Sequence, residues 1–253
     1  MKAQYQLLIV AIIIPCLLCS CRSARSMQKE INPMKSSLYY ELTSPEYSGE
    51  ANQTVYLDFI NYSNLDYYTT IKKKGGLVVP LLLFNYEKNR FEVRLGENSL
   101  TQTYREFLTE ALLAECNSST AINLIDNNKE EAPDSVCHLQ VKVLCNQTSG
   151  KINLTESSIP WFDAPGFITF PNHRAGITHT DLSIVVRLSQ GDNCLLDKTY
   201  TVSNQLSGPQ RGFEDSLQAN EACLNTMTEC LSLATKEIVE SICQELSLVM
   251  ALP

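Results

Sequence analysis

Three side chains suited to acid–base or metal chemistry lie close together in the second half of the chain: His173, His179 and Asp181. Imidazole and carboxylate groups bind transition metals, and a histidine oriented by an aspartate can act as a general base. No Gly-x-Ser-x-Gly nucleophile motif and no fixed metal-ligand spacing accompanies them. We therefore predict no catalytic residue, metal site or cofactor. A metal-dependent or hydrolytic enzyme that uses these three residues is kept as an alternative function.

An aromatic segment, Ile159–Pro171, directly precedes this trio. It contains the single tryptophan of the chain and three phenylalanines among three prolines. Proline and glycine disfavour regular structure, whereas aromatic side chains are costly to leave in water. We therefore expect a loop that either covers an open end of its own core or contacts a partner or lipid. The candidate contact residues are Trp161, Phe162, Phe167 and Phe170.

Seven of the ten cysteines lie beyond residue 21. Cys223, Cys230 and Cys243 are expected on one helix, where seven residues span about 10 Å, beyond the roughly 7 Å Cα separation of a disulfide. Cys137 and Cys145 flank one predicted strand, which holds them apart. Any disulfide must therefore cross between elements, at least one thiol is free, and we favour free thiols packed as small core side chains. Zinc is not expected, because Cys-x-x-Cys and His-x-x-x-His spacings are lacking.

The N-terminus reads as an export signal. Lys2 precedes an apolar run, Leu7–Leu18, which is shorter than the roughly 20 residues that span a bilayer. The run ends in Leu18-Cys19-Ser20-Cys21, which resembles the lipobox of bacterial lipoproteins. That resemblance implies a signal peptide over residues 1–20 and diacylation of Cys21 as the mature N-terminus. An ordinary secretory signal cleaved near Ser20 is the alternative.

The chain is acidic, with a formal net charge of −8 at pH 7. Nucleic-acid binding needs clustered lysines and arginines, so no nucleic-acid partner is expected. Acidity also favours a soluble domain held away from anionic lipid headgroups. The basic run Lys72–Lys74 precedes Gly75–Gly76, and we expect it to decorate a turn.

Hydrophobic periodicity predicts one α+β domain over residues 52–253, joined to the lipid by a flexible tether over residues 21–51. Pro80 places its strand at an edge or a bulge, and Asn98 or Ser99 is the expected N-cap of the first helix. The order of elements favours a mainly antiparallel sheet with two helices packed on one face. The predicted elements are strands at 55–60, 77–84, 91–95 and 139–144, a hairpin over 182–202, and helices over 99–115 and 224–246.

These elements resemble a group of periplasmic lipoproteins. The group comprises lipoproteins auxiliary to ABC-type transport, the lipopolysaccharide-assembly lipoprotein, and relatives of the N-terminal domain of the Tol-system propeller protein. The resemblance spans residues 52–246 and implies a non-enzymatic module that docks onto an envelope machine or lipid carrier. It rests on the proline-containing strand 77–84, the helix 99–115 leading into 121–125, the hairpin 182–202 and the C-terminal helix. The chain departs from the group by a long insertion over residues 150–180.

Two short motifs, Asp134-Ser135-Val136 and Asp215-Ser216-Leu217, resemble the O-glycosylation motif of Bacteroides-type periplasmic proteins. In surface-exported lipoproteins of that phylum, the lipidated cysteine is followed by an acidic run. Here the residues after Cys21, Arg22–Arg25, are basic and do not resemble that signal. We therefore predict a lipid-anchored outer-membrane protein that faces the periplasm. Its predicted role is that of a non-enzymatic binding or scaffolding accessory of an envelope transport or assembly system. An extracellular ligand-binding lipoprotein, with the aromatic segment as its mouth, is the other alternative.

Overall fold

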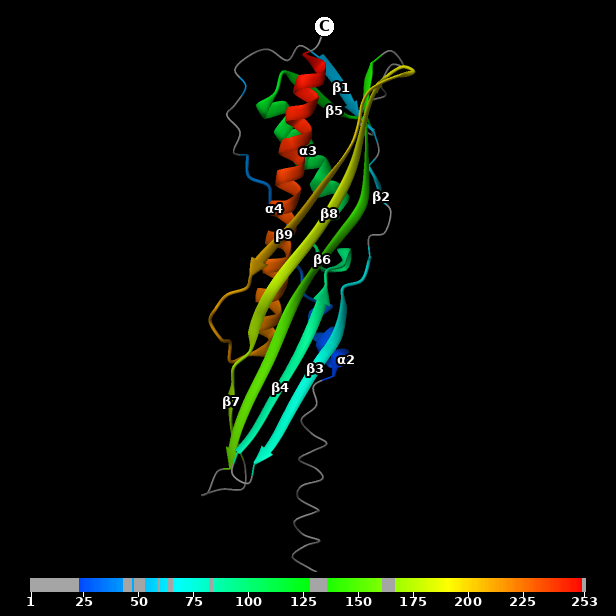
Figure 1. Cartoon of the computed structure of the whole chain (residues 1–253). Helices are drawn as coiled ribbons and strands as arrows, with labels where there is room; N and C mark the ends of the chain where they lie inside the picture. The colour runs from blue at the N-terminus through cyan, green and yellow to red at the C-terminus, as the bar shows by residue number, and fades with distance from the viewer. Residues whose placement is uncertain are drawn as a thin grey trace, which may run out of the picture.

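One long strand, β6 (Cys137–Pro160), runs through the middle of a single sheet (Figure 1). The computed structural model describes residues 23–42, 47, 53–58, 60–62, 66–81, 84–127, 136–160 and 167–251. Within that part of the chain the sheet has nine strands, of which the others are β1 (Gln53–Leu57), β2 (Asn61–Tyr62), β3 (Thr70–Leu81), β4 (Phe84–Arg94), β5 (Ile122–Asp126), β7 (Phe167–Pro171), β8 (Arg174–Gln190) and β9 (Asn193–Ser207). Along one edge β6 pairs with β1, β2 and β4, and along the other with β8 and β7.

Three helices of the described chain pack on one face of this sheet, which we call the inner face. The longest, α4 (Ser216–Met250), has 35 residues and is about 52 Å long; it lies across β6, β8 and β9. α3 (Tyr104–Ser119) packs against α4 and β5, and α2 (Ala24–Ile31) packs against β3 and α4. No described helix is both long and apolar enough to span a bilayer. The opposite, outer face of the sheet carries none of these helices.

Strand alternation places the core on the inner face. On β8, Leu182, Ile184, Val186 and Leu188 are buried, whereas the residues between them are partly or fully exposed, as expected for a strand with one covered face. These side chains pack with the apolar side of α4 and with α3. The helices therefore bury the apolar side chains of the inner face, and the outer face is available for contacts with other molecules.

Gly150 of β6 allows α4 to approach the sheet closely. A Cβ atom at this position would lie 2.7 Å from Cys223 Sγ and 2.9 Å from Met227 Sδ. Both distances are shorter than van der Waals contact, so a side chain here would displace Cys223 and Met227 or the helix that carries them. This close approach lets Cys223 and Met227 pack with α2 in a second apolar cluster.

A disulfide joins the two long helices. Cys116 of α3 and Cys243 of α4 are bonded, with their Cα atoms 5.3 Å apart. Our preference for free thiols was therefore wrong for this pair, although the bond crosses between elements as the geometry required. The remaining cysteines of the described body are free, and three of them, Cys137, Cys223 and Cys230, are buried.

The predicted α+β class is confirmed. The prediction of a mainly antiparallel sheet with two helices is wrong in its details. β1 runs parallel to β5 and β6, and β2 runs parallel to β6, so the sheet is mixed. The chain between β1 and β5 includes α3 on the inner face, and a crossover of this kind returns the next strand in the parallel direction. α2 is a third helix on the same face.

The flexible tether predicted for residues 21–51 is wrong for residues 23–42. Ser23 caps α2 by accepting a hydrogen bond from the Ser26 amide, and both apolar side chains of the inward side of this helix are buried. Beyond α2 the chain follows α4, where the Tyr39 amide donates to Ser232 Oγ at 3.1 Å. Next, Tyr40 donates to the buried carboxylate of Glu115 at 2.9 Å. Residues 23–42 are therefore part of the folded body.

The residues of the predicted insertion, 150–180, lie mainly in strands where the structure describes them, and not in a loop. These residues extend β6 to Pro160, form β7, and begin β8. Pro160 and Pro171 are the last residues of their strands, where a missing amide donor is tolerated. Trp161 and Phe162 lie outside the described residues.

Other local predictions had mixed outcomes. β3 is an edge strand, as Pro80 indicated, and Gly191 with a φ of 55° forms the predicted turn between β8 and β9. Lys72–Lys74 lies inside β3 rather than in a turn. The N-cap of α3 is Thr103, which forms a reciprocal capping box with Glu106, and not Asn98 or Ser99.

We expect Gly150→Val to lower the free energy of unfolding by about 1–3 kcal/mol, because the new side chain overpacks the contact between β6 and α4. Gly75→Val is the matched control, since a Cβ at Gly75 in β3 meets no atom within 4 Å. Urea unfolding of both variants measures the difference. Equal midpoints for the two variants would contradict this account of Gly150.

Candidate functional site

The structure separates the three residues of the enzyme alternative. His173 is buried, and its Nε2 lies 3.7 Å from Glu156 Oε1. His179 and Asp181 lie further along β8, on the exposed outer face, with side chains 46% and 50% exposed. Six residues of extended chain separate the two histidines by about 20 Å. The trio therefore does not form one site, and no group of three potential metal ligands occurs among the described residues.

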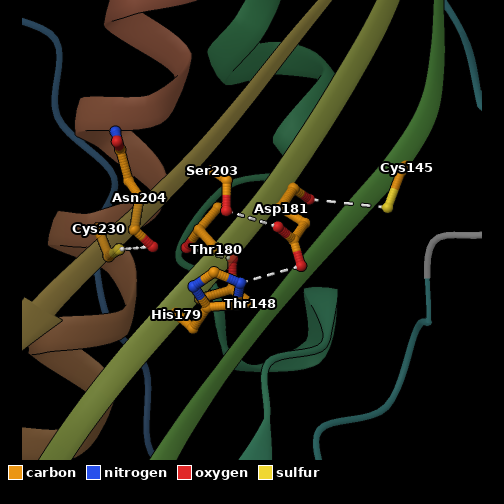
Figure 2. A network of polar contacts seen from close by, with 8 residues as sticks. All are labelled: Cys145, Thr148, His179, Thr180, Asp181, Ser203, Asn204 and Cys230. Atoms are coloured by element: carbon orange, nitrogen blue, oxygen red, sulfur yellow. Dashed lines mark hydrogen bonds and ion pairs between the residues drawn. The ribbon is translucent and has the colours of Figure 1, made fainter.

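His179 and Asp181 do interact with each other and with a serine (Figure 2). His179 Nε2 lies 3.1 Å from Asp181 Oδ2, and Ser203 of β9 donates to Asp181 Oδ1 at 2.9 Å. The aspartate thus stands between the histidine and the hydroxyl, whereas a hydrolase triad needs the histidine between the acid and the nucleophile. This arrangement bridges β8 and β9 on the surface without activating Ser203.

His138 of β6 contacts a carboxylate on the outer face. Its Nδ1 lies 3.1 Å from Asp58 Oδ1, which also accepts a hydrogen bond from the Asn127 amide group at 2.9 Å. Asp58 borders a shallow polar depression of about 580 Å³ on the outer face, together with Gln140, Lys142, Arg187 and Asp197. Its charges are balanced between two acids and two bases. Sequence alone could not single these residues out, because Gln140, Lys142, Arg187 and Asp197 occupy ordinary outward positions of strands and Asp58 directly follows β1.

The described part of the aromatic segment lies at the opposite end of the sheet. β7 pairs antiparallel with the last residues of β6, so that Phe170 stands opposite Ser157 and Ile168 opposite Ile159. Phe170 projects from the outer face with 52% of its surface exposed. Phe167 is the first residue of β7. The predicted loop is therefore wrong for residues 167–171, which form a strand with exposed residues.

Phe170 is part of a larger apolar surface, which we call the distal patch. The register aligns Val79, Tyr86, Ser157 and Phe170 across four strands, and cross-strand partners share one face. Because side chains alternate between the two faces of a strand, this row lies on the outer face, whereas Phe91 and Ile152 face the helices. The patch consists of Leu77, Val79, Phe84, Tyr86, Ile159, Ile168 and Phe170.

The described helices pack on the opposite face of the sheet and do not cover the side chains of the distal patch. Leu77 is 54% exposed, and Phe84 and Ile159 are each 36% exposed. Contiguous apolar patches are uncommon on monomeric soluble proteins and mark surfaces that bind other molecules. The distal patch is therefore the candidate functional site. It includes the predicted contact residue Phe170 together with apolar residues of β3, β4 and β6.

Comparisons with known proteins place the chain in no family. No protein-family model matches the sequence, and no curated protein is similar to it. A Xanthomonas campestris protein of family DUF330 aligns at 8% identity and a TM-score of 0.45, covering 85% of this chain and 94% of that one. An uncharacterised protein aligns at 11% identity and a TM-score of 0.39, covering 84% of this chain and 99% of that one. A homologue of a neuraminyllactose-binding hemagglutinin from Helicobacter pylori aligns at 11% identity and a TM-score of 0.32, covering 83% and 100%. With TM-scores below 0.5, these alignments carry no argument about function.

The free thiols are expected to differ sharply in reactivity. Burial raises the pKa of Cys223 to about 12, so at pH 8 this thiol is protonated and unreactive. Cys194 is exposed on β9. Iodoacetamide followed by peptide mass spectrometry should label Cys194 in the native protein and label Cys223 only in denaturant. Equal labelling of both thiols in the native protein would show that α4 does not cover Cys223.

Proposed function

We propose that this chain is a lipid-anchored protein of the bacterial envelope that acts by binding and not by catalysis. It is anchored through Cys21 in the outer membrane, faces the periplasm, and serves as an accessory of a transport or assembly system. The observation that carries the binding role is the distal patch. Apolar and aromatic side chains on four adjacent strands are kept exposed there, although the same fold buries such residues thoroughly on its inner face.

The disulfide supports export from the cytoplasm. Disulfides persist in oxidising compartments such as the periplasm and are rare where thiol reductants are abundant. The bond between Cys116 and Cys243 is buried among core residues. This agrees with the signal peptide proposed for residues 1–20.

The start of the fold supports a close attachment to the membrane. Ser23 is the first residue of the described body and caps α2. Two residues of extended chain span about 7 Å, so a lipid on Cys21 would be held directly beside the folded domain. The protein is thus proposed to sit against its membrane, and not at the end of a long tether.

The enzyme alternative gains no support from the geometry. His173 is separated from His179, and the carboxylate of Asp181 lies between His179 and Ser203. We therefore keep the binding role as the single proposed function.

Lipid attachment is tested by replacing the proposed acyl acceptor. Cys21→Ser should abolish incorporation of a labelled fatty acid and release the protein from the membrane fraction, because it removes the sulfur that carries the lipid. Cys19→Ser is the matched control and should keep both properties. Fatty-acid labelling that persists in Cys21→Ser would contradict the anchor.

The binding role is tested at the distal patch itself. Photoreactive benzoylphenylalanine in place of Phe170 should form an adduct with a protein or a lipid when whole cells are irradiated. The matched control is the same substitution at Ile177, which is 43% exposed on β8 but lies outside the patch. Mass spectrometry of the adducts identifies what is bound. No adduct beyond the yield at position 177 would contradict a binding role for this surface.

A further inference from the structure

A group of basic side chains borders the distal patch on the outer face; we call it the basic belt. Arg90, Asn153 and Arg174 are aligned across β4, β6 and β8, so both arginines share that face. Lys151 and Lys72 are each paired in register with Glu92, on the same face. The belt consists of Lys72, Lys88, Arg90, Lys151 and Arg174.

The belt has few acidic neighbours. Glu92 binds Lys74 at 2.6 Å, and this hydrogen bond is the main reason that its pKa lies below the usual range. Within the described part of the chain, the five residues of the belt form no ion pair. Their positive charges are therefore available to a negatively charged ligand.

Charge is distributed very unevenly over this acidic protein. β3 and β4 together contain six lysines and arginines and two glutamates. On the other side of the sheet, α4 contains five glutamates and one lysine. An anionic surface would attract the outer face at its distal end and repel the helical layer. The net charge of −8 had suggested a domain held away from anionic headgroups, but it conceals this asymmetry.

The order of side chains along β4 matches the depth profile of a bilayer surface. From the distal end inward, its outward side chains are Phe84, Tyr86, Lys88 and Arg90. Tyr86 is two residues from Lys88, and Phe84 is four residues from it, or about 7–13 Å of strand. Interfacial segments bury their apolar face about 5–10 Å into the boundary between headgroups and acyl chains, with lysine and arginine at headgroup level. An acidic protein surface would not require the apolar side chains to lie beyond the basic ones.

The N-terminal end of the described chain lies toward the same end of the molecule. Contacts of the first segment advance along α4, from Glu30 with Asn220 to Ser36 with Thr228 and Tyr39 with Ser232. The N-terminal end of α2 therefore lies toward the start of α4, and Figure 1 shows α4 beginning at the end of the helical layer nearer β7. The proposed lipid anchor is thus on the side of the distal patch.

We propose that the distal patch and the basic belt together dock onto the surface of an anionic phospholipid bilayer. Phe84, Tyr86 and Phe170 enter the interface, while Lys88, Arg90 and Arg174 bind the headgroup phosphates. The orientation argument rests on the proposed anchor at Cys21, whereas the docking surface does not need it. Docked in this way, the protein directs its polar depression near Asp58 away from the bilayer.

Vesicle flotation tests the proposal on the full mature chain carrying Cys21→Ser, so that no acyl chain contributes. Vesicles of phosphatidylcholine and phosphatidylglycerol in a two-to-one ratio should bind the protein about tenfold or more tightly than pure phosphatidylcholine, because a basic residue near an anionic surface strengthens binding about fivefold. Added salt should weaken this binding. Equal binding to both kinds of vesicle, or no binding to either, would overturn the proposal.

Matched variants locate the docking surface. Phe170→Asp and the double variant Lys88→Glu with Arg90→Glu should each weaken binding to the anionic vesicles by about tenfold or more. Ile177→Asp and Lys142→Glu change the same outer face outside the patch and belt, and both should bind as the parent does. Circular dichroism confirms that each variant is folded. Unchanged binding by the first two variants would refute this location.

The two proposals fail separately. The result of fatty-acid labelling bears on the lipid anchor alone, because the flotation experiment uses a chain that carries Cys21→Ser and therefore has no acyl chain. In the photocrosslinking experiment a phospholipid adduct at position 170 is expected. A protein adduct alone at that position would support the binding role and overturn docking onto the bilayer.

Discussion

The contact between α4 and the strands β6 and β8 is the interaction on which the rest of this structure depends. It is possible because Gly150 presents no side chain to Cys223 and Met227. Several buried threonines in this layer have hydrogen-bond partners there: Thr148 contacts Thr180 at 3.0 Å, and Thr235 donates to the Leu231 carbonyl. α2, α3 and the segment around Tyr39 all attach to α4. None of the described helices covers the outer face, and its exposure follows from this one-sided packing.

Sequence reasoning succeeded where a pattern is local. The alternation of Leu182–Leu188 and the turn at Gly191 predicted the hairpin, and the apolar stripe of residues 224–246 predicted most of α4. It failed where the determining partner is distant. α2 has only Met27 and Ile31 as buried apolar residues, a signal too short to recognise without α4. The second half of β6 carries serine and threonine on both faces, so its strand character comes from pairing with β4 and β7.

The candidate site shows the same division. Phe170 stands out in the sequence because of its aromatic neighbours, but Val79 and Tyr86 become its companions only through register. The basic belt likewise draws Arg90 and Arg174 from strands more than eighty residues apart in the chain. Net charge could not indicate it, because glutamates on α4 outweigh it in the sum. The proposed docking surface is therefore a property of one sheet face and not of any sequence motif.

The length of β6 has a mechanical consequence. β6 and β8 are antiparallel partners along almost their whole lengths, from Cys137 opposite Gln190 to Asn153 opposite Arg174. A force applied between the two ends of the molecule acts along these strands. Their hydrogen bonds are perpendicular to the strands, so such a force loads many of them in shear at once, and they cannot open one after another like a zipper. The paired strands β6 and β8 should therefore resist tension along the long axis of the sheet.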